Sequence, residues 1–330
     1  MKRIALLLLA LGLVAAACGG GDSELEEINV AYFEGWPLPI QYGQADGTFG
    51  DAVGVPVNWV PFANGNAMAE AMEAGSIDIA YSQGLTPFAN AVNRGADLKL
   101  VGVAVSYSEA DNCVAQGGLG VTRDNAASVL NGATVMTPLG NITHYKFLAT
   151  MNFLGVDLSS LTILTAEGGD TTAAAFESGD IDVGCAFGQA VSTMLDTGGN
   201  LIMTGAEQKN DIGVSVYDIV AVPTSFAEDH GDVVTAFLKA TDDFNNAWAG
   251  AADMQNPVIA QAAGMEDVGN FLAGPTWFEF PSIEEQKTDA WLGKQIAEDM
   301  KGQLDLFVEL GEIETALDDF GDFVDPSYLP

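Results

Sequence analysis

An internal repeat constrains the fold of this chain more than any other feature. Residues Asn66–Tyr81 (NAMAEAMEAGSIDIAY) and Asp170–Cys185 (DTTAAAFESGDIDVGC) follow the same course at an offset of 104 positions. Each segment begins with a helical pattern, turns at a glycine (Gly75 or Gly179) and continues into an Ile-Asp-Ile or Ile-Asp-Val strand. The repeat predicts two similar units, one after the other, each about the size of a small domain.

Strand patterns alternate with helical patterns in both units. The strand patterns before the repeated segments are Ile28–Phe33 and Val55–Phe62 in the first unit, and Ala133–Pro138 and Leu161–Thr165 in the second. A further strand pattern, Leu98–Tyr107, leaves the first unit. This alternation predicts an α/β fold with two lobes, each an open, mainly parallel sheet flanked by helices.

The repeat also predicts where the chain passes between the lobes. We expect crossings near Tyr107 and Gly213, so lobe I would comprise residues 28–106 and 214–330, and lobe II residues 107–213. Two crossings would form a hinge. The remaining helical patterns near the C-terminus, roughly at 257–263, 283–300 and 305–310, are expected to pack on lobe I.

The charge of the chain is strongly one-sided, with 46 acidic and 11 basic residues and a formal net charge of −35. Such a surface repels phosphate backbones and anionic lipids, so neither nucleic-acid binding nor peripheral membrane binding is expected. Hydrophobic residues make up 48% of the chain, which is too many for intrinsic disorder.

The first eighteen residues have the pattern of an export signal. Lys2 and Arg3 precede an apolar run at 4–14, and three alanines stand directly before Cys18. Small residues before a cysteine resemble the lipobox of bacterial lipoproteins, which implies a lipid on Cys18 and an acidic tether at 19–27. An ordinary signal peptide cleaved near the last alanine is the alternative. Both interpretations place the protein in the periplasm or on the outer face of the cell membrane.

Export affects the interpretation of Cys113 and Cys185. In an oxidising compartment two thiols more often pair than bind metal, although two separate buried thiols would also fit. Neither CxxC nor HExxH occurs, so no metal or other cofactor is expected. The chain also lacks GxSxG and P-loop motifs and has only two histidines, so we do not expect an enzyme.

Polar and aromatic residues follow the predicted strand ends. Ligands of open α/β sheets bind beyond the carboxyl ends of the strands, where helix N-termini can hold an anion without a basic side chain. The candidate ligand-binding residues are Glu34, Trp36, Ser82, Gln83, Asn141, Thr143, His144, Phe187 and Asp218.

Several candidates have a second interpretation. Trp36, between a glycine and a proline, would form a wall of the site or belong to the core. Ser82 and Gln83 would contact the ligand, cap a helix, or do both. His144 would donate a hydrogen bond to an anion or be a buried histidine with a backbone partner. Asp218 lies among apolar strand neighbours, where it would pair with a ligand ammonium or with backbone groups.

Short motifs of one family run through almost the whole mature chain. They are Gly35, Gln41–Gly47 (QYGQADG), Asn64-Gly65, Gly75–Asp78 (GSID), Pro138–Tyr145, Ser178–Phe187 (SGDIDVGCAF), Val216–Val222 and Phe323–Leu329. With these motifs the chain resembles the taurine-binding proteins of ABC importers, within the broader group that binds sulfonates, nitrate and thiamine precursors. The resemblance implies a type II periplasmic-binding fold, monomeric, that closes on a small zwitterion and presents it to an ABC permease with its ATPase subunits.

The resemblance also implies residue roles. The sulfonate of taurine, or of a close aminosulfonate, would rest on the helix starts at Ser82-Gln83 and Asn141–His144, and Asp218 would hold the ammonium. Alternatives are an alkanesulfonate, nitrate or a thiamine-precursor pyrimidine as ligand. An exported hydrolase and a receptor that feeds a sensor are further alternatives.

A disulfide is implied by the same resemblance. In the type II fold, the strand that follows the first crossing runs antiparallel to the third strand of its lobe. That arrangement would bring Cys113 close to Cys185 and predicts a disulfide between them.

Overall fold

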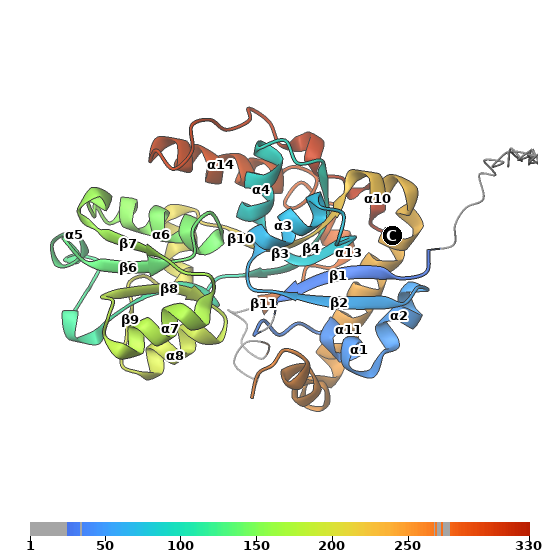
Figure 1. Cartoon of the computed structure of the whole chain (residues 1–330), viewed down its shortest axis with the longest axis horizontal. Coiled ribbons are helices and arrows are strands. Elements are labelled where there is room, and N and C mark those ends of the chain that lie inside the picture. The colour runs from blue at the N-terminus through green and yellow to red at the C-terminus, as the bar shows by residue number, and fades with distance from the viewer. Residues whose placement is uncertain (1–24, 34, 267, 269–271, 273–277) are drawn as a thin grey trace, which may run out of the picture.

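The computed structural model describes residues 25–330, except 34, 267, 269–271 and 273–277, and folds into two lobes (Figure 1). Lobe I holds a six-stranded sheet in the order β11-β4-β10-β3-β1-β2. Its strands are β1 (Ile28–Phe33), β2 (Val57–Phe62), β3 (Ile79–Gly84), β4 (Leu98–Tyr107), β10 (Val216–Pro223) and β11 (Phe278–Glu279).

Lobe II repeats this arrangement in a five-stranded sheet in the order β7-β6-β8-β5-β9. Its strands are β5 (Asp111–Ala115), β6 (Thr134–Thr137), β7 (Thr162–Thr165), β8 (Val183–Phe187) and β9 (Asn200–Leu201). In each lobe three parallel strands are joined by one antiparallel neighbour, β10 beside β3 and β5 beside β8. The two-lobed α/β fold predicted from the repeat is therefore confirmed.

Helices flank both sheets. In lobe I they are α1 (Ile40–Asp46), α2 (Thr48–Val53), α3 (Gly65–Glu73), α4 (Leu85–Asn93), α10 (Thr224–Asp229) and α11 (Gly231–Ala262). In lobe II they are α5 (Ala126–Val129), α6 (Ile142–Phe153), α7 (Gly169–Ser178), α8 (Gln189–Asp196) and α9 (Gly205–Glu207). The repeated segments form α3 with β3 and α7 with β8, again 104 positions apart.

The chain passes from one sheet to the other between Tyr107 and Asp111, and returns between Leu201 and Val216. Each lobe has its own buried clusters: β3 and β10 form the centre of the first, and apolar side chains pack on both faces of the lobe II sheet. The cleft between the lobes lies at the carboxyl ends of the parallel strands.

The C-terminal helices have other bounds than predicted, and one of them makes a contact with lobe II that was not predicted. Helical patterns at 283–300 and 305–310 become a short α13 (Ile283–Gln286), a turn, and α14 (Gln295–Glu309). Helix α14 packs against α4 of lobe I and also against α6 of lobe II. Its Met300 and Leu304 belong to the lobe I core, whereas Phe307 belongs to a lobe II cluster. Helix α14 therefore packs on lobe I as expected, and it also contacts lobe II, because its apolar face is long enough to reach both lobes.

Strand pairing places the two cysteines of lobe II opposite each other. β5 and β8 are antiparallel with Cys113 in register with Cys185, and the two sulfur atoms are bonded at 2.06 Å. The bond closes a loop between positions 72 residues apart.

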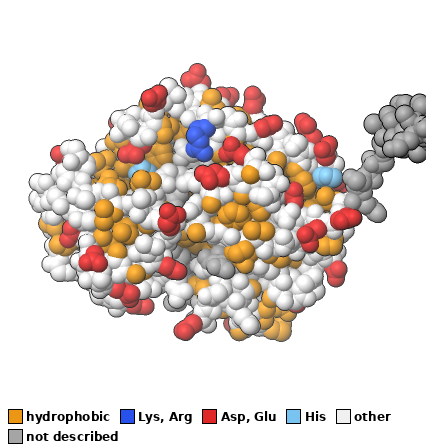
Figure 2. Space-filling view, in the orientation of Figure 1, with side chains coloured by type: hydrophobic (Ala, Val, Ile, Leu, Met, Phe, Trp, Pro, Cys, Tyr) orange, Lys and Arg blue, Asp and Glu red, His pale blue; other side chains and the backbone are white. Residues whose placement is uncertain are grey.

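Acidic side chains are spread over both lobes on the face shown in Figure 2, and basic side chains are sparse there. Within the described part of the chain, no helix is both long and apolar enough to cross a membrane.

Candidate functional site

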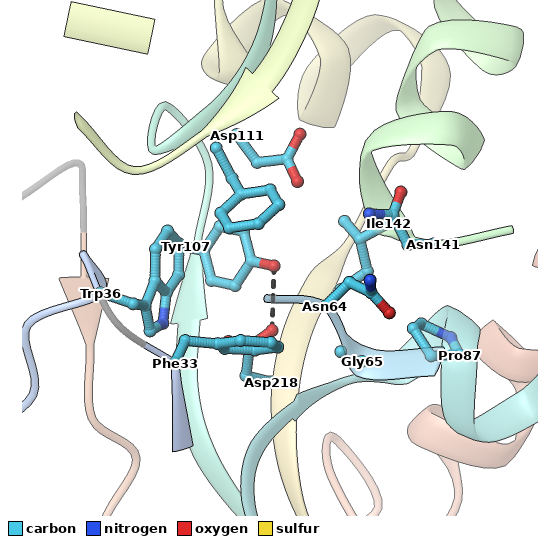
Figure 3. A pocket seen from close by; sticks show the side chains of 12 residues that line it. Phe33, Trp36, Asn64, Gly65, Pro87, Tyr107, Asp111, Asn141, Ile142 and Asp218 are labelled. Atoms are coloured by element: carbon cyan, nitrogen blue, oxygen red, sulfur yellow. Dashed lines mark hydrogen bonds between the residues drawn. The ribbon is translucent and has the colours of Figure 1, made fainter. Parts of the chain in front are cut away.

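A cavity of about 350 Å³, its open mouth included, lies between the lobes (Figure 3). Its lining residues come from both lobes: Phe33, Trp36, Asn64, Gly65, Gly84, Pro87, Tyr107 and Asp218 from lobe I and its crossing, and Asp111, Asn141, Ile142 and Phe187 from lobe II.

Three helix starts form one side of the cavity. Asn64 caps α3 by accepting a hydrogen bond from the amide of Ala67 at 2.9 Å, and Asn141 caps α6 by accepting one from the amide of His144 at 3.1 Å. Gly84 directly precedes α4. First-turn N–H groups have no partner within their helix and carry the positive end of its dipole. Since the three starts face one space, this side of the cavity favours an anion.

Aromatic rings form much of the opposite side. The Trp36 ring packs against Tyr107, with centroids 5.0 Å apart, and against Phe187 at 6.1 Å. Phe33 lies 6.1 Å from Phe187. These rings exclude water, and their faces attract a cation.

Asp218 is a buried carboxylate among these rings. It lies on β10, between β3 and β4, and is 3% exposed. Its Oδ2 accepts a hydrogen bond from the Ser82 hydroxyl at 2.7 Å, and its Oδ1 accepts one from the Tyr107 hydroxyl at 3.0 Å. Burial raises the pKa of Asp218 to about 7, although both hydroxyls act in the opposite direction. A cation in the cavity would stabilise its ionised form.

Ser82 holds a backbone conformation that non-glycine residues rarely adopt. Its φ is +64°, and it is the only described non-glycine residue with a positive φ. The register between β3 and β10 shifts near this point, where β3 ends. Strained backbone of this kind persists where the surroundings hold it in place and is common at functional sites. Here it accompanies the placement of the Ser82 hydroxyl on Asp218.

A second carboxylate, Asp111, enters the cavity from lobe II at the start of β5. Its Oδ2 accepts a hydrogen bond from the Thr143 hydroxyl at 2.8 Å. Burial raises the pKa of Asp111 to about 6, while the nearby Lys146 lowers it. The Lys146 ammonium, itself buried, donates to the backbone carbonyls of Ser108, at 2.7 Å, and of Asp111. Lys146 thus fixes the first crossing next to the site.

Four of the residues predicted from the sequence line the cavity: Trp36, Asn141, Phe187 and Asp218. Ser82 does not line the cavity, but its hydroxyl donates a hydrogen bond to Asp218, which does. Gln83 does not line the cavity, because its amide donates to the carbonyl of Gly65 at 2.9 Å.

Two predicted residues of α6 also lie away from the cavity. Thr143 reaches the cavity only through Asp111, because its hydroxyl donates a hydrogen bond to that carboxylate. His144 accepts a hydrogen bond from the Gly140 amide at its Nδ1, and its ring lies 5.3 Å from that of Phe307. Burial lowers the pKa of His144 to about 4, so the ring is neutral. His144 therefore matches the second of its two interpretations, a buried histidine with a backbone partner. Glu34, the signal at 1–18 with Cys18, and most of the tether lie outside the described residues.

The site residues predicted from the sequence did not include Tyr107, Asn64, Asp111 or Lys146. Asn64 and Asp111 could have been predicted as site residues, because each is a polar residue next to a predicted strand end or crossing. Tyr107 was chosen only as a crossing point. Lys146 is a lone cation in the apolar run KFLATM, and that context would have indicated a buried partner.

Asparagine side chains connect the two walls at the rim of the cavity. Asn66 donates to the Leu139 carbonyl at 3.2 Å, and Asn90 donates to the Gly140 carbonyl at 2.9 Å. Asn64 donates to the Glu167 carbonyl at 3.3 Å. All three bonds run from lobe I to lobe II, so the structure represents a form in which the lobes are in contact.

Comparisons with known proteins agree with this architecture. The taurine-binding periplasmic protein of Escherichia coli (strain K12) is 24% identical over 98% of this chain and 97% of its own length. The periplasmic aliphatic sulphonate binding protein of E. coli has a similar structure, with a TM-score of 0.69, 19% identity, and coverage of 89% of this chain and 96% of the other. The periplasmic nitrate-binding protein from Synechocystis PCC 6803 gives a TM-score of 0.58 at 14% identity and covers 78% and 68% of the two chains.

These solved structures confirm the periplasmic-binding fold that the sequence motifs implied. A family model described as "NMT1/THI5 like" matches residues 24–256, which is more than half of the sequence. The chain therefore belongs to the NMT1/THI5-like family.

Proposed function

We propose that this protein is an extracytoplasmic solute-binding protein of an ABC importer, and that it captures taurine or a close aminosulfonate between its lobes. The observation that supports this proposal is the polarity of the cavity. Three helix starts form a side that favours an anion, and the carboxylate of Asp218 lies among aromatic rings on the other side (Figure 3).

Taurine matches this polarity, because it has a permanent anion and an ammonium two carbons apart. The sulfonate would accept hydrogen bonds from backbone amides at the starts of α3, α4 and α6. The ammonium would bind Asp218, and Trp36 and Phe187 would enclose the short carbon chain. The described residues that line the cavity include no lysine or arginine, so the anion would depend on uncharged donors.

Location and partners follow from the sequence and from the relatives. The N-terminal signal favours export with a lipid on Cys18, and the similar E. coli proteins are named as periplasmic. Delivery of the ligand to an ABC permease by a monomeric protein is part of the same proposal. We propose no catalytic role, since the similar proteins are named for binding.

Competing ligands fit the cavity less well. Nitrate or an unsubstituted alkanesulfonate would leave the buried Asp218 without a cation, which costs free energy. A thiamine-precursor pyrimidine could stack on the rings of Trp36 and Tyr107 but would leave the helix starts without an anion.

Isothermal titration calorimetry on the purified mature protein tests the proposal. We expect taurine to bind, and we expect ethanesulfonate, which lacks the amine, to bind about 30-fold to several thousand-fold more weakly. This range corresponds to roughly 2–5 kcal/mol for a buried carboxylate left unpaired. Equal affinities for the two compounds, or binding of an aminopyrimidine but of neither sulfonate, would refute it.

A further inference from the structure

The second carboxylate of the cavity has an oxygen without a partner. Asp111 is 2% exposed, and its Oδ1 has no hydrogen-bond partner among the described residues, whereas its Oδ2 is held by Thr143. Asp111 lines the same cavity as Asp218 but belongs to the other lobe (Figure 3). An unpaired buried carboxylate oxygen is costly, so its presence in a ligand cavity indicates a donor supplied from outside the chain.

We propose that Asp111 is a second ligand-binding carboxylate, and that Asp111 and Asp218 hold the ligand's ammonium between them, one from each lobe. This inference rests on the proposed function, because it concerns the same site and the same class of ligand. It narrows that class to primary or secondary ammonium compounds, since an ammonium bound by both carboxylates needs at least two N–H donors. It also assigns the specificity for the amine to both lobes.

Positioning of Asp111 is consistent with this role. Thr143 fixes one carboxylate oxygen, and Lys146 fixes the backbone carbonyl of the same residue. The side chain is therefore oriented before any ligand arrives. The Lys146 ammonium is occupied with the carbonyls of Ser108 and Asp111, and no described hydrogen bond joins it to Asp111 Oδ1.

The charges that line the cavity point in the same direction. Asp111 raises the pKa of Asp218 through charge repulsion, in addition to the larger effect of burial. Two carboxylates in one buried space resist simultaneous ionisation. A cation between them removes that repulsion and adds attraction to both lobes. Ligand binding and contact between the lobes are thereby coupled through one charged group.

Variants of the two carboxylates, titrated with taurine and with ethanesulfonate, test the proposal. We expect Asp111→Asn to lower taurine affinity about 10- to 100-fold, the cost of a lost charged hydrogen bond, and to change ethanesulfonate affinity less than about threefold. Asp218→Asn should act in the same direction. Asp182→Asn is the matched control, because Asp182 of lobe II accepts a hydrogen bond from the Thr134 amide at 2.8 Å and does not line the cavity.

The outcomes separate the two proposals. If the wild-type protein binds neither sulfonate, the proposed function fails. If the wild type prefers taurine and Asp218→Asn loses that preference while Asp111→Asn keeps it, only the role of Asp111 is overturned.

A crystal structure of the wild-type protein with taurine gives a measurement that does not depend on the folding of a variant. We expect the ligand nitrogen within hydrogen-bonding distance, about 2.7–3.2 Å, of Asp111 Oδ1 and of an Asp218 oxygen. A nitrogen bound to Asp218 but more than about 4 Å from Asp111 Oδ1 would overturn the inference.

Discussion

The buried carboxyl of Asp218 should make the stability of the protein depend on pH in a predictable direction. In the unfolded chain a carboxyl of this type titrates near pH 4, whereas burial raises its pKa to about 7 in the folded protein. The folded state therefore binds a proton more tightly than the unfolded state does. The stability contributed by this proton is present below about pH 4 and is lost as the pH rises toward 7.

We expect the free energy of unfolding of the ligand-free protein to fall across this window relative to that of Asp218→Asn. Urea unfolding of both proteins from pH 4 to pH 8 measures the difference. The comparison with the variant cancels the titration of the many other acidic groups. A difference that stays constant with pH would contradict the raised pKa.

Ligand affinity should depend on pH in the opposite direction. An ammonium in the cavity favours the ionised form of Asp218, so taurine should bind more tightly as the pH rises through about 7 and should release a proton on binding below that pH. Calorimetry in buffers with different ionisation enthalpies measures the released proton. In Asp218→Asn, Asp111 is the remaining carboxylate among the described residues of the cavity lining that could release a proton.

Two variants of Ser82 separate the effect of its strained backbone on stability from the effect of its hydroxyl on binding. Ser82→Gly and Ser82→Ala both remove the donor to Asp218, but only glycine adopts a φ of +64° without strain. We expect the glycine variant to be more stable than the alanine variant by about 1 kcal/mol in urea unfolding. Both should bind taurine more weakly than the wild type. Equal stabilities would mean that the surroundings do not impose the strain.

At the scale of elements, the disulfide joins two strands of lobe II next to the site. In the chain-entropy model, a cross-link over 72 positions stabilises a fold by roughly 4 kcal/mol. We expect Cys113→Ala combined with Cys185→Ala to lower the free energy of unfolding by about 2–4 kcal/mol. Alkylation of the mature wild-type protein without reductant, followed by intact-mass measurement, should add no label to these residues. Two added labels would show free thiols.

The sequence predicted those elements whose pattern is local. Strand β4 was predicted with its observed bounds, Leu98–Tyr107, and the repeat located α3, α7 and the strands that follow them. The C-terminal helices were misplaced because amphipathic patterns at 283–300 and 305–310 do not specify where a turn interrupts them. Contacts of α14 with both lobes determine its bounds, and such contacts are not visible in a local window.

The site was predictable where the chain itself sets the direction of a side chain. Asn141 caps α6 and therefore lies at the helix start that faces the cavity. Thr143 and His144 follow within one turn, and each step along a helix rotates the side chain by about 100°, so they point elsewhere. Asp111 follows a predicted crossing, but whether its side chain enters the cavity depends on how β5 pairs with β8, a register between segments 72 residues apart.

At the scale of the whole molecule, opening requires more than a bend at the two crossings. The three asparagine bonds across the rim and the packing of α14 on both lobes must change as well. We expect taurine to favour the form in which the lobes touch, because its anion and its cation contact both walls. Small-angle scattering should therefore show a smaller radius of gyration at saturating taurine. An unchanged profile would contradict a two-walled site.

The surface charge should affect the rate at which charged ligands reach the cavity. The chain has a formal net charge of −35, and acidic side chains are spread over both lobes on the face shown in Figure 2. A monoanion approaching from solution is repelled, and its association rate should rise when salt screens the field. A zwitterion has no net charge and is not repelled in this way. The protein could therefore discriminate by encounter rate before any contact is made, and this preference would be strongest in dilute salt.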